Sequence, residues 1–344
     1  MATTREGLPE DLAPGRLGRR ALRVVALLAA LVLIAVLTPG LDDVRRRLGE
    51  AQPGWLALAI VLEALSFVSY VLMFRPIFCR RMAWRSSWEI AGSELAVGSL
   101  VPASGAAWVA LGAWVLRRGG MPADKIARRS VAFLLIKSSV NFVAVAVLGT
   151  VMAIGLVGPD LSLWLTAFPA ALSLTAIALV AAVPRLGPGR DAPADASKLK
   201  RALAATRKAL VGGTAEAGEI VRARDPLVVV GAIGYWAWDN AVLWATFHAV
   251  GATIPLTVVL MGYLIGQLGG LLPIPGGIGG IDGGLIGTLV VYGAPAGAVA
   301  ASVLLYRVIL FWLPLLLGAV CFASLRRALA KEERLDLCRP APAH

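Results

Sequence analysis

Seven ionisable residues interrupt otherwise apolar stretches of this 344-residue chain. They are five acids and two bases, namely Glu63, Glu89, Glu94, Asp239, Asp282, Lys137 and Arg307. A charged side chain near the middle of a membrane costs about 2.5 to 3.5 kcal/mol on insertion scales unless it is paired or hydrated. If these stretches cross a membrane, we expect the side chains to face one another in a polar interior. Such an interior could bind a zwitterionic or anionic group.

Several of the charged residues have polar neighbours. Lys137 and Asn141 are four residues apart, so they share one face of a helix. The residues that we expect to bind a ligand are Arg307, Asp282, Asp239, Lys137, Glu94, Asn240 and Tyr306. The alternative is structural, because Lys137 and Arg307 could pair permanently with acids and fix the packing of the helices.

Common enzyme motifs are missing from the sequence. No Gly-Lys-Ser/Thr phosphate loop occurs, which argues against ATP hydrolysis by this chain. The glycines of 276–287 do not have the dinucleotide-binding spacing, because Asp282 stands where the third glycine is required. Only two histidines are present. We therefore expect no catalytic residue, no metal site and no cofactor, although an enzyme that acts on lipid through a buried carboxylate stays an alternative.

The composition is that of a polytopic membrane protein. Hydrophobic residues make up 58% of the chain and charged residues 16%, with a mean hydropathy of +0.77. A soluble globular protein carries roughly 25% charged residues. The net charge of +12 is explained more simply by basic cytoplasmic loops than by nucleic acid, which we do not expect as a partner.

Six apolar runs are long enough to cross about 30 Å of hydrocarbon as helices. They cover residues 22–38, 54–74, 128–155, 161–183, 227–249 and 298–322. The first run could be a signal peptide. However, Ala35-Val36-Leu37 lacks the small residue that precedes a cleavage site, so we expect an uncleaved anchor. The predicted fold is all-α.

Two further apolar stretches, 88–117 and 255–292, are too long for one span and are broken in the middle. The breaks contain the predicted turn residues Pro102, Ser104, Gly105, Pro273, Pro275, Gly276, Gly277 and Gly279. Proline removes a backbone donor and glycine loosens a helix, so each stretch predicts two short helices joined by a turn within the membrane. Asp282 would lie in the first turn of a short helix. There it could complement the helix dipole or contact a cation or a headgroup amine.

The basic residues predict the orientation. Of the 33 lysines and arginines, 27 fall in the segments 1–21, 75–87, 117–129, 184–226 and 323–344. The positive-inside bias then places both termini in the cytoplasm. The misfit is 39–53, where three arginines are balanced by three acids. With six spans, the broken stretches become re-entrant hairpins of opposite orientation, which suggests an inverted repeat. Alternatively, each stretch crosses fully as two short helices.

The chain divides into a membrane domain and small cytoplasmic parts. We expect a tail over 1–21, the membrane domain over 22–322 and a tail over 323–344. The loop 184–226 contains a predicted helix that Ser197 caps and that runs to about Val211. Its leucines share one face, which suits a helix lying on the anionic inner leaflet. A solvated charged helix is the alternative.

A combined motif identifies a resemblance. Residues 272–282 read LPIPGGIGGID, and the chain continues with Gly293-Ala294-Pro295, Leu305-Tyr306-Arg307 and Phe311-Trp312-Leu313-Pro314. This pattern resembles the lysylphosphatidylglycerol synthase transmembrane-region family, which includes the flippase half of multiple peptide resistance factors. Residues 100–105 and 116–120 match the earlier half more loosely. The similarity extends from about residue 20 to 328.

The resemblance implies a protein of the bacterial cell membrane that moves phospholipids or related lipids between leaflets. Some relatives carry a soluble domain that transfers an aminoacyl group; because this chain ends at His344, we expect that domain to be absent. The expected partner is an anionic or zwitterionic membrane lipid. A lipid-modifying enzyme and a second copy of the chain are further partners left open. Two alternatives to lipid transport are transport of a small polar solute or lipid-linked sugar, and a non-transporting membrane subunit.

Overall fold

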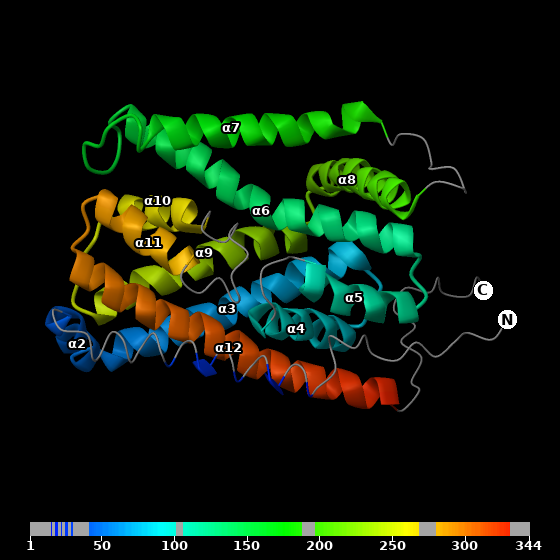
Figure 1. Cartoon of the computed structure of the whole chain (residues 1–344), viewed down its shortest axis with the longest axis horizontal. Helices are drawn as coiled ribbons and strands as arrows, with labels where there is room; N and C mark the ends of the chain where they lie inside the picture. Colours follow the sequence, from blue (N-terminus) through cyan, green and yellow to red (C-terminus); the bar gives the residue numbers. More distant parts are fainter. Residues whose placement is uncertain are drawn as a thin grey trace.

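A computed structural model describes residues 41–100, 106–187, 197–267 and 280–330, and the single positions 15, 18, 19, 22, 25, 26 and 29. Within this part of the chain, every regular element is helical (Figure 1). The elements are α2 (Asp42–Gly49), α3 (Pro53–Phe78), α4 (Trp84–Leu100), α5 (Ala106–Arg118), α6 (Ala123–Ala153), α7 (Ala167–Ala182), the 3₁₀ helix η2 (Val183–Leu186), α8 (Lys198–Arg222), α9 (Pro226–Ala249), α10 (Leu256–Gly266), α11 (Gly280–Val291) and α12 (Ala296–Ala330).

Five helices are long and apolar enough to cross a membrane. They are α3, α6, α7 with η2, α9 and α12. These helices confirm five of the six predicted spans, and the protein is a polytopic membrane protein. The sixth predicted span, 22–38, lies for the most part outside the described residues. Helix α12 continues to Ala330, so the predicted C-terminal tail over 323–344 is helical in its first eight residues.

The two broken stretches form two pairs of short helices. Helices α4 and α5 pack against each other, and so do α10 and α11. The two pairs lie at opposite ends of the bundle (Figure 1). Helix α5 begins at Ala106 and α11 at Gly280, close to the predicted breaks. The predicted turn residues Pro102, Ser104, Gly105, Pro273, Pro275, Gly276, Gly277 and Gly279 lie outside the described residues.

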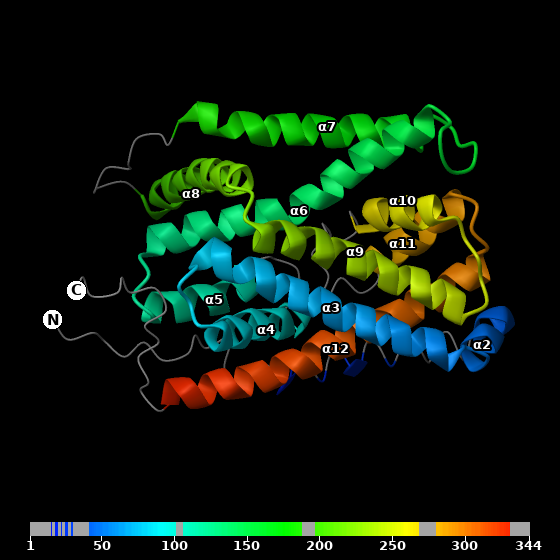
Figure 2. The same cartoon turned by 180° about the vertical axis from the view of Figure 1, so that it is seen from behind.

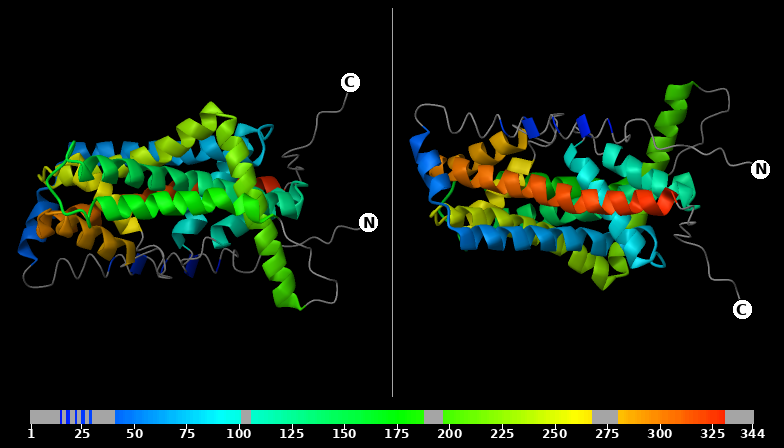
Figure 3. Two further views of the ribbon diagram at one scale, coloured as in Figure 1. Left: turned by 90° about the horizontal axis from the view of Figure 1, so that it is seen from above. Right: turned by 90° about the horizontal axis from the view of Figure 1, so that it is seen from below.

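Helix α8 lies across the long axis of the spans (Figure 3). The Ser197 hydroxyl oxygen accepts a hydrogen bond from the Lys200 backbone N–H at 3.3 Å, which confirms the predicted cap. The predicted end near Val211 is wrong, because the helix runs to Arg222. Gly212 and Gly213 lie directly against residues of α6, so tertiary packing supports the helix at these two adjacent glycines. This packing could not be read from helix propensity.

Helix α2 contains the three arginines of the segment that does not fit the predicted orientation. Asp43 pairs with Arg46 at 2.5 Å and with Arg47 at 2.9 Å, and Asp42 pairs with Arg45. The hydrogen bond from Arg47 holds the pKa of Asp43 below its usual value. Each of the three arginines of 39–53 is therefore paired with a nearby acid of the same helix.

The charged interior lies between two apolar clusters. One cluster, nearer α8, includes Phe74 and Phe133, and the other, nearer α2, includes Val242 and Phe247. Helices α3 and α9 run side by side through both (Figure 2). They approach closely at Gly231 of α9, where an added Cβ would stand 2.7 Å from the Met73 Cβ and 2.8 Å from the Ser69 carbonyl oxygen.

We predict that Gly231→Ala destabilises the protein. The added methyl group overlaps the α3 backbone, and overpacking of this kind costs about 1 to 3 kcal/mol. Gly218→Ala on α8 is the matched control, because the nearest atoms to its Cβ are 4.0 Å away on the flexible Arg222 side chain. Thermal unfolding of the purified variants in one detergent measures the effect. Equal midpoints for Gly231→Ala and wild type would contradict the packing described here.

Candidate functional site

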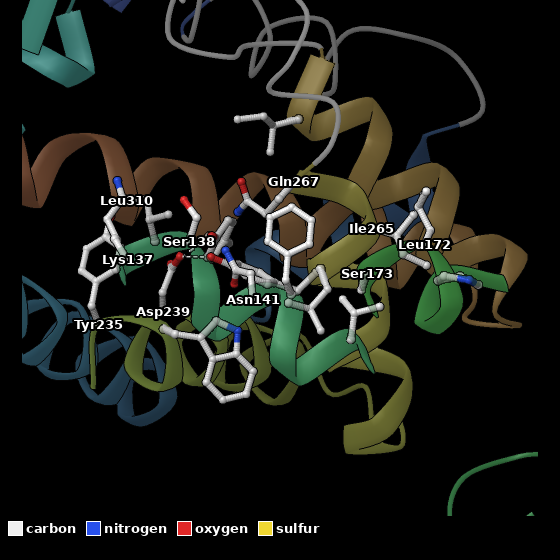
Figure 4. A pocket seen from close by; sticks show the side chains of 18 of the residues that line it. Lys137, Ser138, Asn141, Leu172, Ser173, Tyr235, Asp239, Ile265, Gln267 and Leu310 are labelled. Carbon is white, nitrogen blue, oxygen red and sulfur yellow. Dashed lines mark hydrogen bonds between the residues drawn. The ribbon is translucent and has the colours of Figure 1, made fainter. Parts of the chain in front are cut away.

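A cavity of about 600 Å³ lies between α6, α7, α9, α10 and α12, at the boundary of the two apolar clusters. Figure 4 shows polar side chains in one part of it, with Leu172 of α7 on the other side. The polar side chains that line the cavity are Lys137, Ser138, Asn141, Ser173, Tyr235, Asp239, Tyr263, Gln267, Tyr306 and Arg307. The cavity therefore combines an apolar wall with hydrogen-bonding and charged groups at membrane depth.

Helical spacing explains why three helices present polar groups together. Each contributes two residues four positions apart, and such residues lie one above the other on a helix face. The pairs are Lys137 with Asn141, Tyr235 with Asp239, and Tyr263 with Gln267. The rest of each helix is mostly apolar, so this polar face turns toward the cavity while other faces contact neighbouring helices or lipid.

Asp239 is hydrogen-bonded at both oxygens of its carboxylate. Its side chain is 8% exposed, and both carboxylate oxygens accept hydrogen bonds from tyrosine hydroxyl groups. Tyr263 of α10 donates to Oδ2, and Tyr306 of α12 donates to Oδ1 at 3.0 Å. Hydrogen bonds to an ionised acceptor are stronger than bonds between neutral groups. The carboxylate thus joins three helices that are distant in sequence.

Lys137 places a positive charge between two acids. Its ammonium group is attracted electrostatically by Glu94 and Asp239. The nitrogen also lies 5.5 Å from the ring centroid of Tyr235 and 6.0 Å from that of Tyr70, which is within the range of a cation–π contact. The site therefore holds a cationic side chain in the cavity wall, under the attraction of two acids.

Arg307 forms an ion pair with Asp282, through its Nε and the carboxylate Oδ1. Both side chains are nearly buried, at 12% and 8% exposure. Asp282 lies in the first turn of α11, as predicted, and the pair joins that turn to α12. Asp282 is therefore held by an arginine as well as by the dipole of its own helix.

Glu94 and Asn240 do not line the cavity. Glu94 accepts a hydrogen bond from the Tyr70 hydroxyl at 3.2 Å. It lies against Gly112 of α5, where an added Cβ would stand 1.6 Å from its Oε1. The Asn240 amide donates to the Trp236 carbonyl oxygen at 2.8 Å along its own helix. Glu94 acts on the cavity only through the charge of Lys137.

Four of the seven predicted ligand-binding residues share the cavity wall. They are Lys137, Asp239, Tyr306 and Arg307, and Asp282 joins them through Arg307. Sequence reasoning did not select Tyr263, Tyr235, Gln267 and Ser173. The spacing from Tyr263 to Gln267, four residues inside an apolar run, was the signal that could have identified the polar face of α10.

Two apolar pockets adjoin the cavity and share residues with it. One, of about 430 Å³, lies between α6, α7 and α8 and shares Ser138 and Phe142. The other, of about 460 Å³, lies between α7, α10 and α11 and shares Leu172 and Ile265. The first reaches α8 and the second reaches the end of α11, so the pockets extend in opposite directions along α7.

Comparison with known proteins assigns the family. Residues 22–318 match the family described as lysylphosphatidylglycerol synthase TM region. The chain belongs to this family. The match confirms the resemblance seen in the LPIPGGIGGID motif and covers the helices that build the cavity.

Proteins similar to this lysylphosphatidylglycerol synthase TM-region chain occur in an archaeon. A UPF0104 membrane protein of Methanothermobacter thermautotrophicus is 27% identical over 336 residues, which cover 86% of this chain and 91% of that protein. A UPF0104 membrane protein of the same organism also matches a shorter segment, with 32% identity over 93 residues, or 26% of this chain and 28% of that protein. The first similarity spans nearly the full length of both chains.

We predict that Arg307 and Asp282 contribute to stability as a coupled pair. Arg307→Gln or Asp282→Asn leaves one buried charge without its partner, which costs about 3 to 5 kcal/mol. In the double variant no unpaired charge remains, so the loss is smaller than the sum of the two single losses. Unfolding of the four proteins in one detergent gives the coupling energy.

The pair between Arg46 and Asp43 serves as the control, because both side chains are exposed. Arg46→Gln and Asp43→Asn are expected to change the unfolding midpoint far less than the buried substitutions. Additive losses at Arg307 and Asp282 would show that the two charges do not stabilise each other.

Proposed function

We propose that this protein moves a phospholipid or a chemically related amphiphile between the leaflets of the membrane. The observation that carries the proposal is the shared wall between one polar cavity and two apolar pockets that extend in opposite directions. A lipid has the same division into a charged headgroup and apolar chains. Membership of the lysylphosphatidylglycerol synthase TM-region family supports the same conclusion.

The charges of the cavity suit a headgroup. Lys137 and Arg307 line it and can attract a phosphate, while Asp239 can attract the amine of a zwitterionic headgroup. Asp282 would then set the position of the Arg307 guanidinium. In this proposal Tyr306 orients Asp239, and Glu94 balances Lys137 from behind. No step requires ATP, a metal ion or another cofactor, and we assign no catalytic residue.

Helix α7 provides the route for the acyl chains. It packs mainly against α6, and it contributes residues to the cavity and to both apolar pockets. Its Leu174 and Leu179 are 54% and 65% exposed, which is expected of a helix that faces lipid. We propose that the headgroup crosses inside the cavity while the chains slide along α7 in the hydrocarbon.

The proposed topology places α8 on the cytoplasmic side. The basic segments 75–87, 117–129 and 184–226 connect helix ends near α8, and α8 itself lies across the spans where the inner leaflet would meet it. The α4–α5 pair would then enter from the cytoplasm and the α10–α11 pair from outside. Two re-entrant pairs of opposite orientation amount to an inverted repeat, with both termini in the cytoplasm.

The adjoining apolar pockets favour a lipid over the two alternatives. A small polar solute needs the polar cavity but makes no use of about 430 and 460 Å³ of apolar space. A non-transporting subunit needs neither buried charges nor a cavity at membrane depth. A lipid uses the cavity and the pockets together. A lipid-modifying enzyme that supplies the substrate, and a second copy of the chain, are compatible partners.

Transport of fluorescent phospholipids in reconstituted vesicles tests the proposal. We predict that wild-type protein speeds the movement of an anionic or zwitterionic phospholipid between leaflets. Ser173→Trp places a large ring in the cavity from α7, so we expect it to lower the rate at least about tenfold, which corresponds to about 1.4 kcal/mol. The measurement is the fraction of labelled lipid accessible to an outside quencher over time.

Thr175→Trp is the matched control, since Thr175 lies on the same helix and is exposed. It is expected to transport at the wild-type rate. If wild type moves no phospholipid, with or without an ion gradient, the proposed function is wrong. If Ser173→Trp transports as fast as wild type, lipid does not pass through this cavity.

A further inference from the structure

A second, smaller cavity lies on another side of Asp239. It has a volume of about 120 Å³ and is lined from α3, α4, α9 and α12. Its polar lining residues are Glu63, Ser66, Ser99, Tyr235 and Asp239. Tyr235, Asp239 and Leu310 also line the large cavity, so these residues form the wall between the two spaces. The proposed function makes no use of Glu63.

Glu63 is buried, and one of its carboxyl oxygens has no donor in the described part of the chain. Its side chain is 6% exposed, and its Oε2 has no hydrogen-bond partner among the described residues. The charged group that acts on it is Asp239, another acid. An ionised carboxylate in this position would be desolvated, unpaired and repelled by its neighbour. Each of these effects favours the neutral acid.

The two serine hydroxyl groups of the small cavity already donate to backbone carbonyl oxygens. Ser66 donates its hydroxyl hydrogen to the Tyr235 carbonyl oxygen at 3.3 Å, and Ser99 donates to the Leu95 carbonyl oxygen at 3.0 Å. A hydroxyl group has one hydrogen, so what each serine can offer Glu63 is a lone pair. A carboxylate would find no free donor in these two serines, whereas a carboxylic acid has an O–H group that their oxygens can accept.

We propose that Glu63 is a proton-binding site whose occupancy is coupled to the charge on Asp239. With Asp239 ionised and no headgroup amine beside it, Glu63 holds a proton. When a cationic headgroup amine binds Asp239 from the large cavity, the repulsion on Glu63 falls and the proton leaves. The proton moves between the Glu63 carboxylate and water, and no other bond changes. Proton binding stands without the proposed function, whereas its coupling to transport rests on it.

Other charged and titratable groups surround the pair. Tyr263 of α10 and Tyr306 of α12 donate to Asp239, and Arg307 and Lys137 attract it. Tyr235 of α9 interacts electrostatically with both Asp239 and Glu63. The two cations thus act on Asp239 from the large cavity, whereas Glu63 lines the small one. This separation makes Glu63 the acid that needs a proton.

Infrared spectroscopy of the full-length protein in lipid tests proton binding directly. At neutral pH the wild type is expected to show a protonated-carboxyl C=O band that Glu63→Gln lacks. Glu89→Gln is the matched control, because Glu89 is an equally buried acid that receives hydrogen bonds from Arg85 and Ser324. That variant is expected to keep the band. Glu63→Asp retains a carboxyl group and is expected to show a protonated-carboxyl band. This variant keeps the test valid if Glu63→Gln alters the fold.

An unchanged band in Glu63→Gln overturns the proton site, and so does its absence in the wild type. A band that disappears when Na⁺ replaces K⁺ at constant pH also overturns it and assigns a sodium site. These results do not depend on transport. If the band behaves as expected while no phospholipid moves, the proposed function fails and the proton site stands.

Proteoliposomes test the coupling. A pH gradient is expected to change wild-type phospholipid movement several-fold, and Glu89→Gln is expected to respond in the same way. Glu63→Gln is expected to transport at one rate with or without the gradient. A gradient response that persists in Glu63→Gln overturns the coupling, even if the infrared result holds.

Discussion

The need to neutralise charge away from water is the constraint on which this arrangement of helices depends. Asp239 is stabilised by hydrogen bonds from α10 and α12, Arg307 by its ion pair with Asp282 of α11, and Lys137 by the charge of acids on α4 and α9. Each solution requires a residue from a helix that is distant in sequence. The charges that make the interior usable by a polar ligand therefore also decide which helices must meet. Removing one partner changes the packing as well as the chemistry.

Close backbone contact makes these meetings possible. Gly231 brings α9 against α3, and Gly112 leaves room for the Glu94 carboxylate beside α5. Apolar attraction between helices is weak in lipid, so small residues and buried polar contacts carry more of the association. The polar cavity lies between the two apolar clusters, where α6, α9 and α10 carry polar side chains.

Patterns that depend on local sequence were predictable, whereas contacts between distant helices were not. Hydropathy located five spans, and the Pro-Gly breaks located two pairs of short helices, because both signals lie within one segment. Charge alone selected Asp239 and Arg307. It could not show that Tyr263 would donate to Asp239 or that Arg307 would hold Asp282, since those pairs depend on how separate helices pack. The end of α8 was misjudged for the same reason: its glycines are supported by α6.

Helix α7 has a different relation to the fold from the other spans. It is held mainly by α6, yet it supplies a wall to the cavity and to both apolar pockets. Substitutions along it can alter what the protein accommodates without disturbing the ion pair, the Asp239 network or the α3–α9 contact. Under the proposed function, selectivity and stability would be encoded largely on separate helices. Within this family, such a division would let new substrate preferences evolve by drift in a single span while the charged interior stays unchanged.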